Sequence, residues 1–74
     1  MQITVKLFAT LREGRFKVSS LELISGTEVG QVADQLKIPR EDLALIFVNG
    51  RDAELDHVLK EGDTLSLFPP VGGG

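Results

Sequence analysis

The most unusual feature of this 74-residue chain is its ending, Phe-Pro-Pro-Val-Gly-Gly-Gly, which runs to the α-carboxylate. Pro69 and Pro70 restrict the backbone at the base of this segment, whereas Gly72, Gly73 and Gly74 lack a Cβ and would let another protein close tightly around the chain. Residues 69–74 reach at most about 20 Å when extended. Such an arm suits the delivery of a C-terminal carboxylate into a narrow active site.

Other catalytic chemistry has little support in the residues. The chain contains no Cys, Tyr or Trp, and its single histidine, His57, lies beside Asp56 in a predicted loop. A lone histidine without a motif is typical of an exposed surface position, and no Gly-x4-Gly-Lys phosphate loop is present. We therefore expect no autonomous catalysis, no metal site and no bound cofactor.

Length and charge narrow the class of protein. A chain of 74 residues forms one small domain, and 42% apolar with 26% charged residues is typical of a globular protein. The net charge of −3 has the wrong sign for binding nucleic acid, and no apolar run approaches the ~20 residues of a membrane-spanning helix. These observations predict a cytoplasmic protein without a nucleic-acid or membrane partner.

The charge is unevenly placed along the chain. Residues 1–40 carry four acids and six bases, for +2, whereas residues 41–63 carry seven acids and two bases, for −5. The acidic stretch is either a set of solvated loops or a surface that steers a basic partner, and the sequence leaves both interpretations open.

The hydrophobic pattern predicts two strands followed by a helix. Alternation over 2–8 and β-prone residues over 16–24 favour a first hairpin with a turn at 12–15 and a bulge or register slip at Ser19-Ser20. Apolar residues at helical spacing follow from Val29, with Thr27 as the expected N-cap and an end near Lys37, before Pro39. Gly30 suggests close packing of this helix on the sheet.

The second half predicts a helical turn over 39–42 and three further strands. An apolar run over 44–48 precedes Asn49-Gly50, the strongest short hairpin signal, and a short return strand over 51–53. Residues 64–68 form the last strand, with Leu65 and Leu67 on one face. The expected fold is α+β, a mixed sheet of four to five strands on one main helix, with a domain over 1–68 and the arm over 69–74.

Strand parity also predicts a docking surface. If the alternating apolar residues face the helix, Phe8 and Phe68 face away from it, and parallel neighbouring strands would bring both to the root of the arm. Either Phe47 or the pair Ile46 and Val48 would extend this patch. The alternative is that loops cover these side chains.

Several fragments together resemble a known group of proteins. They are the opening Ile-Thr-Val-Lys-Leu-Phe-Ala over 3–9, Val-Asn-Gly over 48–50, Glu-Gly-Asp over 61–63 and the ending from Phe68. The whole chain resembles the small sulfur carriers with a ubiquitin-like β-grasp fold, and Phe-Pro-Pro-Val before the glycines resembles the small subunit of molybdopterin synthase, the MoaD type.

The resemblance implies a reaction cycle carried out by partner proteins. A ubiquitin-activating-like adenylyltransferase would use ATP to adenylate the terminal carboxylate, a sulfur donor would convert it to a thiocarboxylate, and the molybdopterin synthase large subunit would accept that sulfur. The reactive role falls on Gly74, with Gly73, Gly72, Val71, Pro70 and Pro69 as the arm. Phe8, Phe68 and Phe47 would contact the partners.

The ending departs from the MoaD pattern in one respect. That branch usually ends in two glycines, whereas three are common in the thiamin sulfur carriers, the ThiS type, so either Gly74 or a trimmed Gly73 would react. The alternatives are a thiamin-thiazole sulfur carrier, a ubiquitin-like modifier conjugated to target lysines, and a simple binding module.

Overall fold

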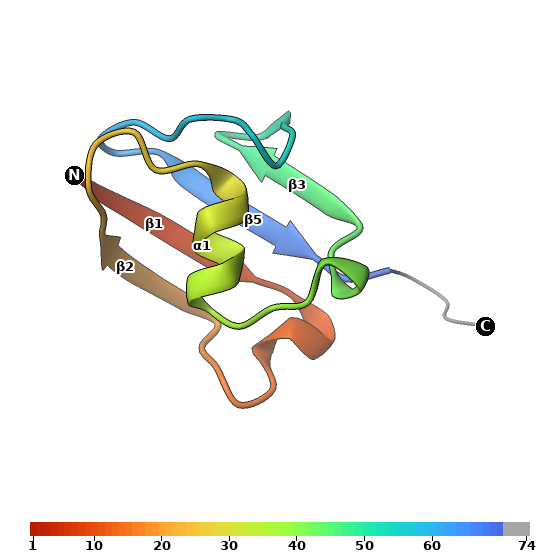
Figure 1. Ribbon diagram of the computed structural model, residues 1–74. Helices are drawn as coiled ribbons and strands as arrows, with labels where there is room; N and C mark the ends of the chain where they lie inside the picture. The colour runs from red at the N-terminus through yellow and green to blue at the C-terminus, as the bar shows by residue number, and fades with distance from the viewer. Residues whose placement is uncertain (71–74) are drawn as a thin grey trace.

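Within residues 1–70 the protein forms one mixed sheet with a single α-helix packed across it (Figure 1). The computed structural model describes residues 1–70. The strands are β1 (Gln2–Leu7), β2 (Val18–Glu22), β3 (Leu45–Val48), β4 (Arg51–Asp52) and β5 (Thr64–Phe68), the helix is α1 (Val29–Gln35), and two 3-10 turns are η1 (Ala9–Arg12) and η2 (Arg40–Asp42). The sheet order is β2-β1-β5-β3-β4, which confirms the predicted α+β class.

The two central strands, β1 and β5, run parallel, and every other neighbouring pair is antiparallel. Thr4 lies opposite Thr64, and Leu7 lies opposite Leu67. The C-terminal ends of β1 and β5 therefore lie at the same end of the sheet, and the chain continues from there into the arm (Figure 1). This register fulfils the condition that the predicted docking surface requires.

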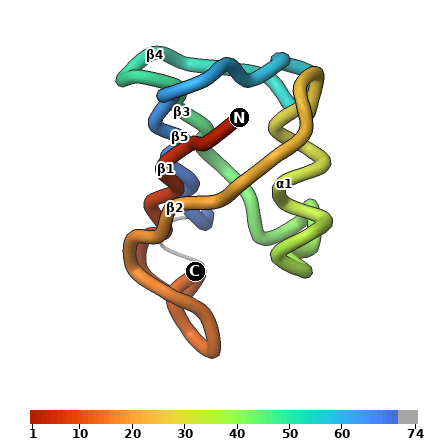
Figure 2. Tube along the Cα trace, turned by 90° about the vertical axis from the view of Figure 1, so that its left-hand side faces the viewer, coloured from red at the N-terminus to blue at the C-terminus, as the bar shows by residue number. Residues whose placement is uncertain are grey.

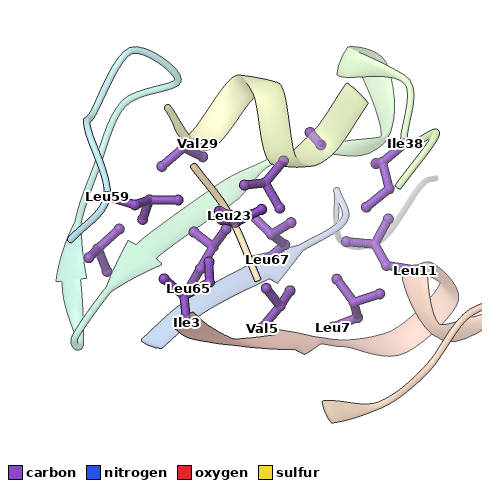
Figure 3. Close-up of a cluster of buried hydrophobic side chains, with 13 residues drawn as sticks. Ile3, Val5, Leu7, Leu11, Leu23, Val29, Ile38, Leu59, Leu65 and Leu67 are labelled. Carbon is purple, nitrogen blue, oxygen red and sulfur yellow. The ribbon is translucent and has the colours of Figure 1, made fainter. Parts of the chain in front are cut away.

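The core fills the space between α1 and one face of the sheet (Figures 2 and 3). The alternating residues of the central strands, together with one side of the helix, are almost fully buried: Ile3, Val5, Leu7, Leu65, Leu67, Val29, Val32 and Ala33. Leu11, Leu23, Ile38 and Leu59 close the layer from the connections. Because α1 spans only seven residues, most of its stability comes from this packing.

The start of α1 differs from the prediction. Glu28, not Thr27, is the N-cap, and it forms a reciprocal capping box with Gln31, whose Oε1 accepts from the Glu28 amide at 2.8 Å. The Thr27 hydroxyl instead donates to the Ile24 carbonyl at 2.7 Å. The Leu59 amide donates to the Thr27 carbonyl, so tertiary pairing holds Thr27 one position outside the cap.

Gly30 also has another role than predicted. Its amide donates to the Leu55 carbonyl at 2.8 Å, and an added Cβ would lie 3.0 Å from Arg40 Nη2 and 3.2 Å from the Leu55 carbonyl oxygen. The close approach is therefore to the segment after β4 and to η2, not to the sheet.

No helix within residues 1–70 is long and apolar enough to cross a membrane.

Of the two predictions made for the hairpins, one is wrong and one is confirmed. β1 and β2 pair in continuous register from Gln2 opposite Glu22 to Lys6 opposite Val18, so the predicted bulge at Ser19-Ser20 is wrong. Asn49 and Gly50 have φ values of +54° and +80°, as the tight two-residue turn between β3 and β4 requires.

Arg15 fastens the long β1–β2 connection to the end of α1. Its guanidinium donates to the carbonyls of Leu36, Lys37 and Leu11 at 3.1, 2.9 and 3.1 Å. These bonds satisfy carbonyls at the C-terminal end of the helix, where a positive charge is favourable.

The substitution Arg15→Ala is expected to lower the free energy of unfolding by about 1–2 kcal/mol, because three charged hydrogen bonds of a partly exposed group are lost together. For a domain of this size, the thermal midpoint should fall by roughly 4–16 °C in a calorimetric scan. Arg51→Ala is the matched control, since Arg51 is exposed and makes no side-chain hydrogen bond within the described residues. Equal midpoints for the two variants would contradict the role of Arg15.

Candidate docking and carrier site

Three phenylalanines cluster on the sheet face opposite α1. The rings of Phe8 and Phe68 are stacked, with centroids 4.1 Å apart and an interplanar angle of 8°. Phe47 meets Phe68 edge-on, at 5.7 Å and 89°. The structure therefore brings together all three predicted residues, and we define Phe8, Phe47 and Phe68 as the aromatic cluster. Each of the three side chains is half-buried, so no loop covers the cluster completely.

Strand pairing decides which residues of β3 join this surface. Ile46 lies opposite Leu67 and Val48 opposite Leu65, so these two face the core. Phe47 has the opposite parity and faces away from α1. The alternative that Ile46 and Val48 extend the patch is therefore wrong.

Backbone hydrogen bonds hold the chain up to the last residue of β5. The Ala44 amide donates to the Phe68 carbonyl at 2.8 Å, and the Phe8 amide donates to the Leu67 carbonyl at 3.2 Å. Beyond Phe68, Pro69 is half-buried and Pro70 is exposed. The arm therefore begins beside the aromatic cluster. The predicted roles of Val71, Gly72, Gly73 and Gly74 lie outside the described residues.

A small apolar hollow adjoins the root of the arm. It has a volume of about 280 Å³ and is lined by Phe8, Ala9, Thr10, Leu45, Phe68, Pro69 and Pro70. We call it the arm-root hollow. Both prolines of the arm form part of its wall, so a protein that grips the arm at its base also covers this hollow.

Sequence reasoning missed Leu45 and Arg12. Leu45 lies opposite Phe68 on the outer face and is 47% exposed. Leu45 and Phe47 are two positions apart on one strand and therefore share a face, so the sequence could have identified Leu45 as part of the docking surface. The Arg12 guanidinium lies 5.4 Å from the Phe8 ring centroid, on a residue predicted to form only a turn. Its Nε donates to the Leu7 carbonyl at 2.7 Å. Arg12 thus adds a positive charge to the edge of the aromatic cluster.

Ala9 turns the chain at the wall of the arm-root hollow in an unusual conformation. Its φ of +52° lies in the left-handed region, which costs an alanine about 1–2 kcal/mol. The Leu11 amide, which donates to the Phe8 carbonyl at 3.1 Å, and the bond from Arg12 to Leu7 hold the turn in place. Backbone strain of this kind is frequent at functional sites, and no sequence signal marked this alanine.

Replacing Arg12 by Gln should lower the free energy of unfolding by about 1 kcal/mol, because the cation over Phe8 and the bond to the Leu7 carbonyl are both lost. Arg12→Lys keeps the charge but not the guanidinium geometry, so it should recover less than half of the loss. Urea titration of both variants measures this difference. Full recovery by lysine would show that only the charge matters.

His57 lies away from the arm. It is exposed, as expected for a surface histidine, and it lines a hollow of about 530 Å³ with Arg51, Lys60 and Asp63. That hollow contains no residue of the aromatic cluster. The structure therefore does not bring the histidine to the predicted carrier site.

Solved structures of similar fold include archaeal and bacterial proteins. A Pyrococcus furiosus protein described as a candidate subunit 1 of molybdopterin converting factor is 30% identical, with a TM-score of 0.78 over 96% of this chain and 99% of that chain. Small archaeal modifier protein 1 of Haloferax volcanii is 28% identical, with a TM-score of 0.78 over 95% and 98%. A comparison with curated protein sequences finds no match.

The complex of subunits 1 and 2 of molybdopterin-converting factor from Helicobacter pylori contains a chain that is 24% identical to this one. Its TM-score is 0.68, and each chain is covered completely, which demonstrates a shared fold. Together with a sheet of five strands on one helix, these likenesses identify the ubiquitin-like β-grasp fold. The ThiS family model matches residues 5–74, nearly the whole chain, so this protein belongs to the ThiS family.

Proposed function

We propose that this protein is a sulfur carrier whose C-terminal glycine is adenylated and then converted to a thiocarboxylate. The observation that carries the proposal is the position of the arm: Pro69 and Pro70 leave the sheet directly beside the aromatic cluster and the arm-root hollow. A partner can therefore bind the apolar surface and draw the glycines into its own active site.

The chemistry requires activation because a carboxylate is a poor electrophile. Attack of a carboxylate oxygen on the α-phosphate of ATP forms an acyl adenylate and releases pyrophosphate, and sulfide then attacks the carbonyl carbon and expels AMP. One oxygen of the terminus is replaced by sulfur, without net oxidation or reduction. A ubiquitin-activating-like adenylyltransferase would supply ATP and the catalytic groups, and this chain would supply the docking surface and the carbonyl.

Affinity has to come from the docking surface, not from the arm. Ordering each free residue costs roughly 1–2 kcal/mol, so insertion of three glycines would cost several kcal/mol. Aromatic side chains at the centre of an interface offset such a cost. The stacked Phe8 and Phe68, with Phe47 against them, are suited to this role.

Within this class, we propose that the sulfur serves molybdopterin formation in the cytoplasm, with the molybdopterin synthase large subunit as acceptor. The ending Phe-Pro-Pro-Val supports this choice, as does the likeness to the Pyrococcus furiosus protein. The ThiS family model and the three glycines favour the second candidate, a thiamin-thiazole carrier. The likeness to small archaeal modifier protein 1 favours the third, a modifier of lysines.

Intact mass spectrometry tests the carrier function. The chain is incubated with ATP, magnesium, sodium sulfide and the adenylyltransferase of the same genome, and its mass should rise by about 16 Da, because oxygen is exchanged for sulfur at an activated acyl group. An unchanged mass, under conditions in which a known carrier of that enzyme is loaded, would refute the proposal.

Affinity capture from lysate of the source organism separates the three pathways. Recovery of a molybdopterin synthase large subunit supports the first, and recovery of a thiazole synthase supports the second. A ladder of lysine conjugates supports the modifier. A chain bearing Phe68→Asp serves as the control for nonspecific capture.

A further inference from the structure

We infer that a second groove, which shares a lining residue with the arm-root hollow, binds a basic amphipathic segment of the adenylyltransferase that receives the arm. This inference rests on the proposed function. The groove lies between η2 and the segment that follows β4, with a volume of about 510 Å³, and we call it the edge groove. It is lined by Arg40, Leu43, Ala44, Leu45, Ile46, Asp52, Ala53, Glu54 and Leu55.

Leu45 joins the edge groove to the carrier site. The same side chain lines both the edge groove and the arm-root hollow. The reason is the strand pairing: Leu45, at the start of β3, lies opposite Phe68, at the end of β5, where the arm leaves the sheet (Figure 1). A protein that holds the arm and covers Leu45 therefore also contacts one lining residue of the edge groove.

The edge groove has a mixed lining that includes two exposed leucines. Leu45 and Leu55 are 47% and 38% exposed, although most large aliphatic residues of the chain are buried. Leu43, Ile46 and Ala53 pack against the core from the inner side of the groove. The edge groove can therefore accept at least one aliphatic side chain from a binding partner.

The uncompensated charge of the edge groove is negative. Arg40 is engaged by Asp34, with Nη1 and Oδ1 3.2 Å apart, and its Nη1 also donates to the Gly30 carbonyl at 3.1 Å. Asp52 and Glu54 are exposed and form no ion pair within residues 1–70. Two free carboxylates beside exposed leucines are complementary to an aliphatic residue flanked by lysine or arginine.

The wider charge distribution supports the same partner. Residues 41–63, which supply every lining residue of the groove except Arg40, have a net charge of −5. Of the two interpretations open at the sequence level, this placement favours steering of a basic partner over a merely solvated loop. Association should consequently weaken as ionic strength rises.

A pair of peptides tests the edge groove independently of the carrier reaction. The ¹⁵N-labelled chain is titrated with acetyl-RLKLR-amide and with acetyl-ELELE-amide. The basic peptide should shift the amide resonances of Leu45, Ala53 and Leu55, and the acidic peptide should not. Equal shifts with both peptides, shifts elsewhere, or no shifts at millimolar peptide would overturn the inference. Shifts that depend on protein concentration without peptide would identify a second copy of this chain as the occupant, which would also overturn it.

Matched variants then test the groove in the loading reaction. Asp52→Asn with Glu54→Gln should raise the KM for the carrier about fivefold without changing kcat, since each exposed charge pair contributes modestly. Glu13→Gln with Asp56→Asn makes the same charge change outside the groove and should leave KM within about twofold. Equal KM values for the two double variants would overturn the inference. If the wild-type chain gains no sulfur, the proposed function fails, and the peptide titration still decides the groove.

Discussion

Deletion of Gly73 and Gly74 is expected to abolish sulfur loading completely while leaving the domain folded. Removal of two residues shortens the arm by about 7 Å, so the new terminus no longer reaches the activating centre of a partner docked on the aromatic cluster. Intact mass spectrometry after incubation with ATP, sulfide and the adenylyltransferase should show no gain in mass. The thermal midpoint should be unchanged, because the core consists of residues before Pro69.

Deletion of Gly74 alone is the matched control. Loading of this chain would identify Gly73 as the reactive terminus, whereas loss of loading would assign the reaction to Gly74. A large fall in the thermal midpoint of either truncation would show that the arm belongs to the folded body and would contradict the carrier model.

The substitution Phe68→Asp is expected to weaken binding of the adenylyltransferase by about 2–4 kcal/mol, or roughly 30- to 1000-fold. It removes the ring that stacks on Phe8 and meets Phe47, and it places a negative charge at the centre of the docking surface. Isothermal titration calorimetry measures the change.

Ser20→Asp is the matched control, because Ser20 is exposed on the same face of the sheet and lies on β2, away from the aromatic cluster. It adds the same charge and should leave the affinity within about twofold, given that exposed charges at the rim contribute little. Equal affinities for Phe68→Asp and the wild-type chain would remove the aromatic cluster from the docking surface.

Much of the fold follows from local pattern. The alternation over β1 places Ile3, Val5 and Leu7 on one face, and all three are buried. β5 begins at Thr64 and ends at Phe68 as predicted, and Asn49-Gly50 forms the turn of the second hairpin. These features are predictable because one buried face imposes a period of two on each strand.

The alternation of side chains along each strand also predicts part of the candidate site. It predicts that Phe8 and Phe68 lie side by side at one end of the sheet if β1 and β5 are parallel neighbours, and the stacked rings confirm this arrangement. Leu45 has the same parity as Phe47 and could have been predicted on the same grounds. The cation of Arg12 over the Phe8 ring depends on the path of η1, which no pattern in the sequence indicates.

Tertiary contacts decide the features that the sequence did not predict. Thr27 and Glu28 can each cap a helix, and the bond from the Leu59 amide to the Thr27 carbonyl settles the choice in favour of Glu28. The positive φ of Ala9 is another such case, because alanine has no preference for that conformation. The edge groove likewise arises only where η2 meets the segment after β4.

The central claim is that the reactive group is the chain's own terminal carbonyl. Fragmentation of the loaded, intact chain in the mass spectrometer tests it most directly. The added ~16 Da, the difference expected when sulfur replaces oxygen at the acyl group, should be confined to fragments that contain Gly74 or, after trimming, Gly73. Sulfur found on any internal residue, or loading of a chain whose C-terminus is amidated, would contradict it.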